Sequence, residues 1–200
     1  MVCRAGGLLS RSGERHLSRS LHTDPYPVRA TRRAAASVPV RVCRPRPGFV
    51  HPAGPADVVR ILTFFGPAAA YGLRGVELRQ RPWAGTGPAV AALRVPGVVV
   101  LFEQPAPPWV VPGRLTAAAT ARLERAGALV TAGLAGTVVD WPGGTLRDFM
   151  LFDGLMHEIG HHMIQHAARK RRTRAMRTAD HERRADAYAM RARHAWAAQC

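Results

Sequence analysis

The eleven residues 156–166, MHEIGHHMIQH, constrain the fold most, because their histidines repeat at the spacing of an α-helix. His157 and His161 are four residues apart, so on a helix their Cβ atoms lie on one face about 5–6 Å apart. Two imidazoles in this arrangement can bind one zinc ion. Glu158 lies about 100° around the helix from His157, where its carboxylate can accept a proton from water without binding the metal. Gly160 leaves room for another backbone to come close.

Such a zinc site needs a third ligand from elsewhere in the chain. A helix over residues 180–192, DHERRADAYAMRA, supplies Glu182. His181 is adjacent and is the alternative ligand, but the two side chains diverge by about 100°, so only one of them can point at the metal. Asp186 lies one turn beyond Glu182 and favours the glutamate, because a carboxylate there can accept the free ring N–H of a zinc-bound histidine. Small residues on the same flank, Ala185 and Ala189, allow two helices to pack closely.

The sequences HEIGH and ERRAD together resemble the gluzincin zinc metallopeptidases, nearest in pattern to the compact ImmA/IrrE-type or HtpX-type members. The resemblance covers residues 145–192. It implies that zinc is bound by His157, His161 and Glu182, that Glu158 is the general base and that Asp186 lies behind the ligands. Tyr188, Arg191 and His194 are, by the same resemblance, candidates to stabilise the oxyanion of the transition state.

We therefore expect a zinc metalloendopeptidase that hydrolyses peptide bonds with a metal-activated water and Glu158 as general base. The expected partner is a peptide or protein substrate. The alternative is a zinc-stabilised regulatory or polyanion-binding protein without turnover. An intact Glu158 weighs against that alternative, because a purely structural zinc site does not need this residue.

Hydrophobic patterning over residues 51–200 predicts one α+β domain with a small, largely antiparallel sheet, in which the HExxH helix packs against the C-terminal ExxAD helix. A helix should end at Gly66-Pro67, and strands are expected at 75–80, 89–95 and 97–104, the last two forming a hairpin at Pro96-Gly97. A helix over 114–128 and a strand over 136–142 follow, whereas the proline-rich segment 105–113 should be irregular. A capping box formed by Thr145 and Asp148 should start the HExxH helix, and the stripe Phe149, Phe152, Met156, Ile159 and Met163 should face the core.

The formal charge of +16 comes almost entirely from arginine, since Lys170 is the only lysine. Residues 1–50 carry ten arginines and five prolines without a hydrophobic period, so we expect a basic, disordered tail. The segment 168–178 is also basic. Codon bias toward arginine explains this composition, and weak contact with nucleic acid or another polyanion is the competing interpretation.

The three cysteines are scattered, which favours reduced thiols and a cytoplasmic protein. No apolar run reaches the roughly 20 residues that a membrane span needs.

Three further features have two interpretations each. His162 and His166 are also four residues apart and form either a second metal site or, as we favour, an exposed polar face. Asp153, one turn before His157, is either in contact with the site or, as we favour, solvated. The strand over 97–104 either binds a substrate backbone by strand addition or is buried, and the sequence does not decide between them.

Overall fold

The structure is a computed structural model that describes residues 38–82, 89–134, 136–167 and 178–199. It contains both helices and small sheets, as the α+β prediction requires. The strands are β1 (Val40–Val42), β2 (Phe49–Val50), β3 (Gly75–Arg79), β4 (Ala91–Arg94), β5 (Val98–Phe102), β6 (Gln104–Pro105), β7 (Trp109–Val111), β8 (Leu129–Gly133) and β9 (Gly136–Asp140). The helices are α1 (Pro55–Ala70), α2 (Ala117–Arg125), α3 (Thr145–Phe149), α4 (His157–Ala167) and α5 (Ala179–Ala197), with a π-helical segment, η1 (Met150–Met156), between α3 and α4.

The described strands form three sheets rather than one. The largest has the order β1-β3-β5-β4, and its β1–β3 and β3–β5 pairs are parallel, whereas β4 pairs antiparallel with β5. The other two sheets, β2-β6 and β7-β9-β8, are antiparallel. A largely antiparallel sheet is therefore the wrong description of the largest sheet. The chain runs from β1 to β3 through helix α1, and a helical crossover of this kind places the two strands parallel to each other.

The predicted hairpin at Pro96-Gly97 is confirmed, with Ala91 opposite Leu101 and Arg94 opposite Val98. Gly97 has φ +73° and its backbone passes so close to residue 72 that a Cβ would lie 2.5 Å from the Gly72 carbonyl oxygen. A glycine is thus required at this turn for both conformational and steric reasons.

The prediction of a disordered tail over residues 1–50 is wrong for residues 38–50. Residues 1–37 lie outside the described part of the chain, but β1 and β2 belong to two of the sheets. Between them, Arg46 donates from its backbone N–H to Glu103 at 2.8 Å, and its guanidinium forms an ion pair with the same carboxylate. The prediction that 105–113 is irregular is also wrong at β7, where Trp109 pairs with Val139.

Arg46→Ala is expected to lower the free energy of unfolding by about 2–3 kcal/mol, because Glu103 is completely buried and would lose a charged hydrogen-bond donor. Burial raises the pKa of Glu103, but the hydrogen bonds and charge of Arg46 outweigh it, and the pKa lies below its ordinary value of 4.5. The stabilisation is thus present above pH 4.5 and is lost as the pH falls below it. Urea unfolding at pH 7 and at pH 3 measures both effects. The exposed Arg44→Ala is the control and should change stability by less than about 0.5 kcal/mol.

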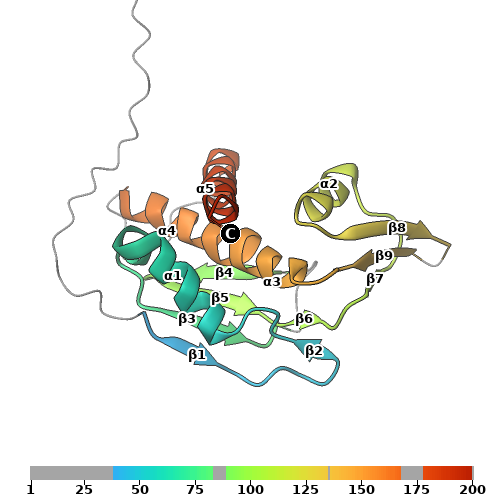
Figure 1. Ribbon diagram of the computed structural model, residues 1–200, viewed down its shortest axis with the longest axis horizontal. Helices are drawn as coiled ribbons and strands as arrows, with labels where there is room; N and C mark the ends of the chain where they lie inside the picture. Colours follow the sequence, from blue (N-terminus) through green and yellow to red (C-terminus); the bar gives the residue numbers. More distant parts are fainter. Residues whose placement is uncertain (1–37, 83–88, 135, 168–177, 200) are drawn as a thin grey trace, which may run out of the picture. The chain divides into compact units, whose positions relative to one another are not determined.

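Helices α1 and α4 lie on one side of the four-stranded sheet and α5 packs on α4, whereas α2 packs beside β8 (Figure 1). Helix α1 extends past the predicted stop at Gly66, where the chain kinks with φ +68° and continues to Ala70.

The predicted stripe along the HExxH helix is confirmed, because Phe149, Phe152, Met156 and Ile159 are buried in the core and Met163 packs against it. The predicted capping box is wrong. The cap residue is Gly144, and the Thr145 hydroxyl donates to the Pro142 carbonyl at 2.8 Å.

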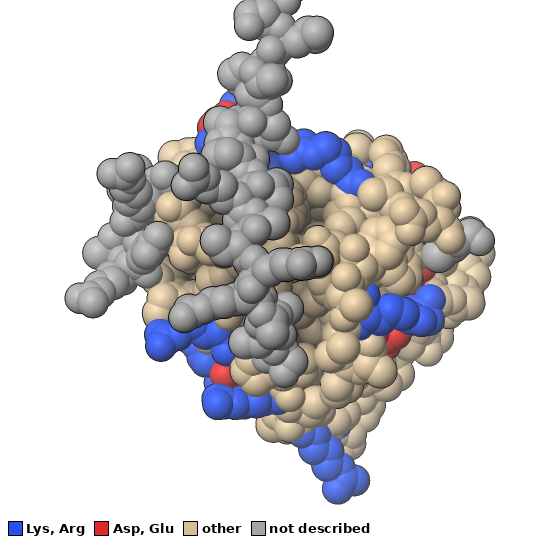
Figure 2. Space-filling model, turned by 60° about the vertical axis from the view of Figure 1, so that its left-hand side comes forward, with Lys and Arg blue, Asp and Glu red and all other residues tan. Residues whose placement is uncertain are grey.

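Among the described helices, none combines the length and apolarity that crossing a bilayer would need. Arginine side chains lie in separate groups over the face shown in Figure 2, some of them beside acidic residues. Several arginines form ion pairs, including Arg94 with Glu77 at 2.7 Å and Arg60 with Asp57 at 2.8 Å. The basic segment 168–178 falls outside the described residues except for Thr178, so both interpretations of its charge stay predictions.

Candidate metal centre

The helix that carries the HExxH motif is assembled from three consecutive segments. Helix α3 passes directly into η1, and η1 into α4, so that His157 follows immediately after the π-helical turn. π-Helical turns inside longer helices occur frequently at functional sites. Gly154, within η1, allows this turn to lie against the sheet, since a Cβ there would be 3.3 Å from Val90 and 3.4 Å from Leu101.

Helix α5 crosses α4 at a point where both helices carry small residues. A Cβ on Gly160 would lie 3.0 Å from the Cα atom of Ala185 and 3.2 Å from its carbonyl oxygen. Ala185 is completely buried at this crossing. At the start of α5, the Thr178 hydroxyl accepts from the backbone N–H of His181 at 3.3 Å, which caps the helix about two turns before the crossing. The close crossing brings the first turn of α5 over the histidines of α4.

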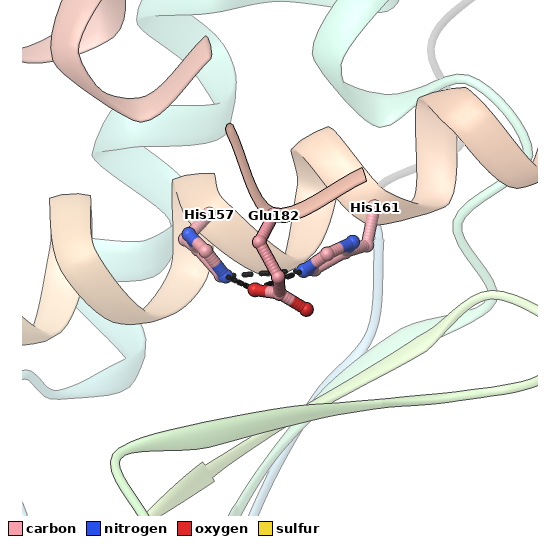
Figure 3. A group of neighbouring side chains, drawn as sticks. All are labelled: His157, His161 and Glu182. Atoms are coloured by element: carbon pink, nitrogen blue, oxygen red, sulfur yellow. Dashed lines mark hydrogen bonds and ion pairs between the residues drawn. The ribbon is translucent and has the colours of Figure 1, made fainter. Parts of the chain in front are cut away.

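Three side chains from these two helices converge on one point. The Nε2 atoms of His157 and His161 lie 3.1 Å apart, and the Glu182 Oε2 atom lies 3.4 Å from the first and 3.3 Å from the second. Figure 3 shows the carboxylate of Glu182 reaching down from α5 between the two rings on α4. His157 and His161 are buried, whereas 43% of the Glu182 side chain is exposed, so the carboxylate side of the triangle is the more accessible to solvent.

The size of this triangle fits a zinc ion. Four ligand atoms in a tetrahedron around zinc, each about 2.0–2.1 Å from it, are about 3.3 Å from one another. The three observed separations of 3.1, 3.4 and 3.3 Å are close to that edge length. The donor set, two imidazole nitrogens and one carboxylate oxygen, is one that zinc accepts. It leaves one of the four tetrahedral positions for water or substrate.

Asp186 lies on the far side of the His157 ring from this triangle. Its Oδ1 atom is 2.9 Å from the Nδ1 atom of His157. The distance is that of a hydrogen bond, but the N–H direction is not well aligned, and Nδ1 has no properly directed hydrogen bond. A carboxylate beside Nδ1 is the type of group that, in metal sites, holds the proton of a histidine on Nδ1 and leaves Nε2 to bind the metal.

Glu158 is almost completely buried, with 3% of its surface exposed, next to His157 in the first turn of α4. Burying an ionised carboxylate raises the free energy of the folded state unless another group pairs with it.

The other candidate residues on α5 do not belong to the donor triangle. His181 is not part of the group of donor atoms that lie within 4.8 Å of one another, which among the described residues consists of His157, His161 and Glu182. Tyr188 packs against the core beside Gly160, and burial raises the pKa of its hydroxyl. Arg191 and His194 are exposed on α5.

Two of the favoured interpretations of neighbouring residues are wrong. His162 does not belong to an exposed face: it is 1% exposed, because the turns at Gly72 and Gly97 close over it. Its Nε2 atom is 3.0 Å from the Tyr71 carbonyl, and burial lowers its pKa. Asp153 is not simply solvated, since it forms ion pairs with Arg193 and Arg122.

A cavity of about 290 Å³ adjoins the metal centre on the side of His157 that faces Asp186. Sequence reasoning did not include its basic lining residues, which are Arg122, Arg125 and Arg193. A signal was available for one of them, because Arg193 lies seven residues after Asp186 and therefore on the same face of α5.

Comparison with known proteins gives no match to a family model, to a curated protein or to a solved structure. The resemblance to gluzincins accordingly depends on the two motifs alone.

Proposed function

We propose that this chain is a zinc-dependent peptidase. The observation that supports this most is the triangle of His157 Nε2, His161 Nε2 and Glu182 Oε2, whose sides match the edges of a zinc tetrahedron. The sequence provides the second support, because the residue after the first histidine is an acid, as a hydrolytic site of this kind requires.

Each residue has a distinct task in this proposal. His157, His161 and Glu182 hold the metal, and Asp186 orients the ring of His157. Zinc, when bound, supplies the Lewis acidity that activates water and polarises a carbonyl group. Glu158 accepts a proton from the attacking water and delivers it to the departing amine. Because Glu158 is only 3% exposed, its carboxylate is largely shielded from bulk water.

The strand that would bind the substrate backbone is β4. The sequence offered residues 97–104 for this role, but β5 lies between β3 and β4, so both of its edges are already paired. The two edge strands of the sheet are β1 and β4, and of these β4 packs against α4. An extended peptide added to the outer edge of β4 would lie alongside the helix that carries the histidines.

The test is cleavage of a broad peptide mixture by purified protein of known metal content. We expect hydrolysis by protein that contains one zinc ion per chain, complete loss of hydrolysis after removal of zinc with a chelator, and recovery when zinc is added back. Mass spectrometry of the products measures cleavage, and elemental analysis measures zinc. Cleavage that persists in metal-free protein would contradict the proposal.

A further inference from the structure

The cavity beside His157 has a floor and a rim of different character. Phe152, Ala126 and Ala189 form a largely apolar floor that is buried in the core. The cavity extends along α5 in the direction away from Glu182, from Asp186 to His194. His157 belongs both to this cavity and to the donor triangle, so the cavity lies next to the metal centre, on the Asp186 side of the His157 ring.

The charged groups of the cavity do not cancel. Asp153 lies between Arg122, at 3.4 Å, and Arg193, and is paired with both. Asp186 is engaged with the ring of His157 at 2.9 Å. Arg125, at the C-terminal end of α2, is exposed at the rim and has no acidic partner among the described residues. Three arginines and two carboxylates line the cavity, and both carboxylates lie beside other groups, so the net charge of the cavity is positive.

We infer that this cavity is a specificity pocket for an acidic side chain of the peptide substrate, and that Arg125 binds its carboxylate. The inference rests on the proposed peptidase function. The buried floor takes the methylene groups of a glutamate or aspartate, while the guanidinium of Arg125 forms hydrogen bonds to the carboxylate oxygens. Arg122 and Arg193 hold the pocket in shape through Asp153 and add to its positive charge.

The experiment measures peptide binding without turnover, using the zinc-loaded Glu158→Gln variant. Two randomised decapeptide pools are compared that are identical except that one contains glutamate where the other contains glutamine, both lacking aspartate. We expect about ten-fold tighter binding of the glutamate pool, the effect of one charged hydrogen bond. Arg125→Gln should abolish this preference. Arg114→Gln, the same change at an exposed arginine before α2 and outside the cavity, should leave it intact.

Equal binding of the two pools, or a preference that survives Arg125→Gln, would overturn the inference. Cleavage-site mapping with the wild-type protein separates this outcome from a failure of the proposed function. Hydrolysis without an acidic residue at a fixed distance from the cut would refute the pocket and retain the peptidase. A glutamate preference in binding that depends on Arg125, without any hydrolysis, would retain the pocket and refute the peptidase.

Discussion

Glu158→Gln is expected to lower the rate of peptide hydrolysis by about 10²–10⁴-fold while the protein retains one zinc ion per chain. Glutamine has the same shape as glutamate but cannot accept a proton at neutral pH, so the change removes the general base without creating a cavity. Because Glu158 lies outside the donor triangle, the metal ligands are unchanged. Initial rates on a cleavable peptide, measured beside zinc content and circular dichroism, give the comparison.

Glu124→Gln provides a matched control, because it makes the same chemical change at an exposed position on α2. It should hydrolyse the peptide at the wild-type rate. A Glu158→Gln protein as active as the wild type would eliminate this residue as the base. If both proteins bind zinc and neither cleaves any peptide, the alternative of a zinc-stabilised regulatory protein gains support, and salt-dependent binding to a polyanion then tests it.

Glu182→Ala is expected to weaken zinc binding by about 10²–10³-fold, if the 10–16 kcal/mol typical of structural zinc sites is shared among four ligands. The Glu182 side chain is 43% exposed, so its removal from the metal-free protein leaves little unfilled space. The contacts that Glu182 makes with the two imidazoles are partly exposed and therefore weak, so the thermal midpoint of the metal-free variant should differ little from that of the metal-free wild type. The stabilisation that added zinc gives the wild type should be lost at the same zinc concentration.

Local patterning predicted those parts of the fold in which neighbours in sequence are also neighbours in space. The stripe from Phe149 to Met163 follows helical spacing and faces the core. The β4–β5 hairpin is set by the proline and glycine of its turn. In both cases the periodicity of one segment was enough, because the hydrophobic face and the turn are each defined within a few residues.

Pairing between distant segments could not be predicted in the same way. β1 contains only three residues and lies in an arginine- and proline-rich segment, and its partner β3 is more than thirty residues further along the chain. The ion pair between Arg46 and Glu103 spans 57 residues. Nothing in the composition around Arg46 distinguishes it from the other arginines of that segment, so a folded part of the chain was predicted to be disordered.

At the candidate site, sequence spacing identified His157 and His161 because one helix carries both. Glu182 required a second argument, the carboxylate of Asp186 one turn later, and the structure places both beside His157. His162 shows the limit of this reasoning. Its spacing to His166 matches that of the first pair, yet its burial is decided by turns at Gly72 and Gly97, which belong to other elements.

The distinction between Glu182 and His181 is the most direct test of the account, since these neighbours on α5 are the two candidates for the third ligand. Metal per chain should be measured in the wild type, Glu182→Ala and His181→Ala after equilibration at the same limiting free zinc. We predict one zinc ion per chain in the wild type and in His181→Ala, and loss of the metal in Glu182→Ala. Retention of zinc in Glu182→Ala, or its loss in His181→Ala, would contradict the three-ligand site and the peptidase built on it.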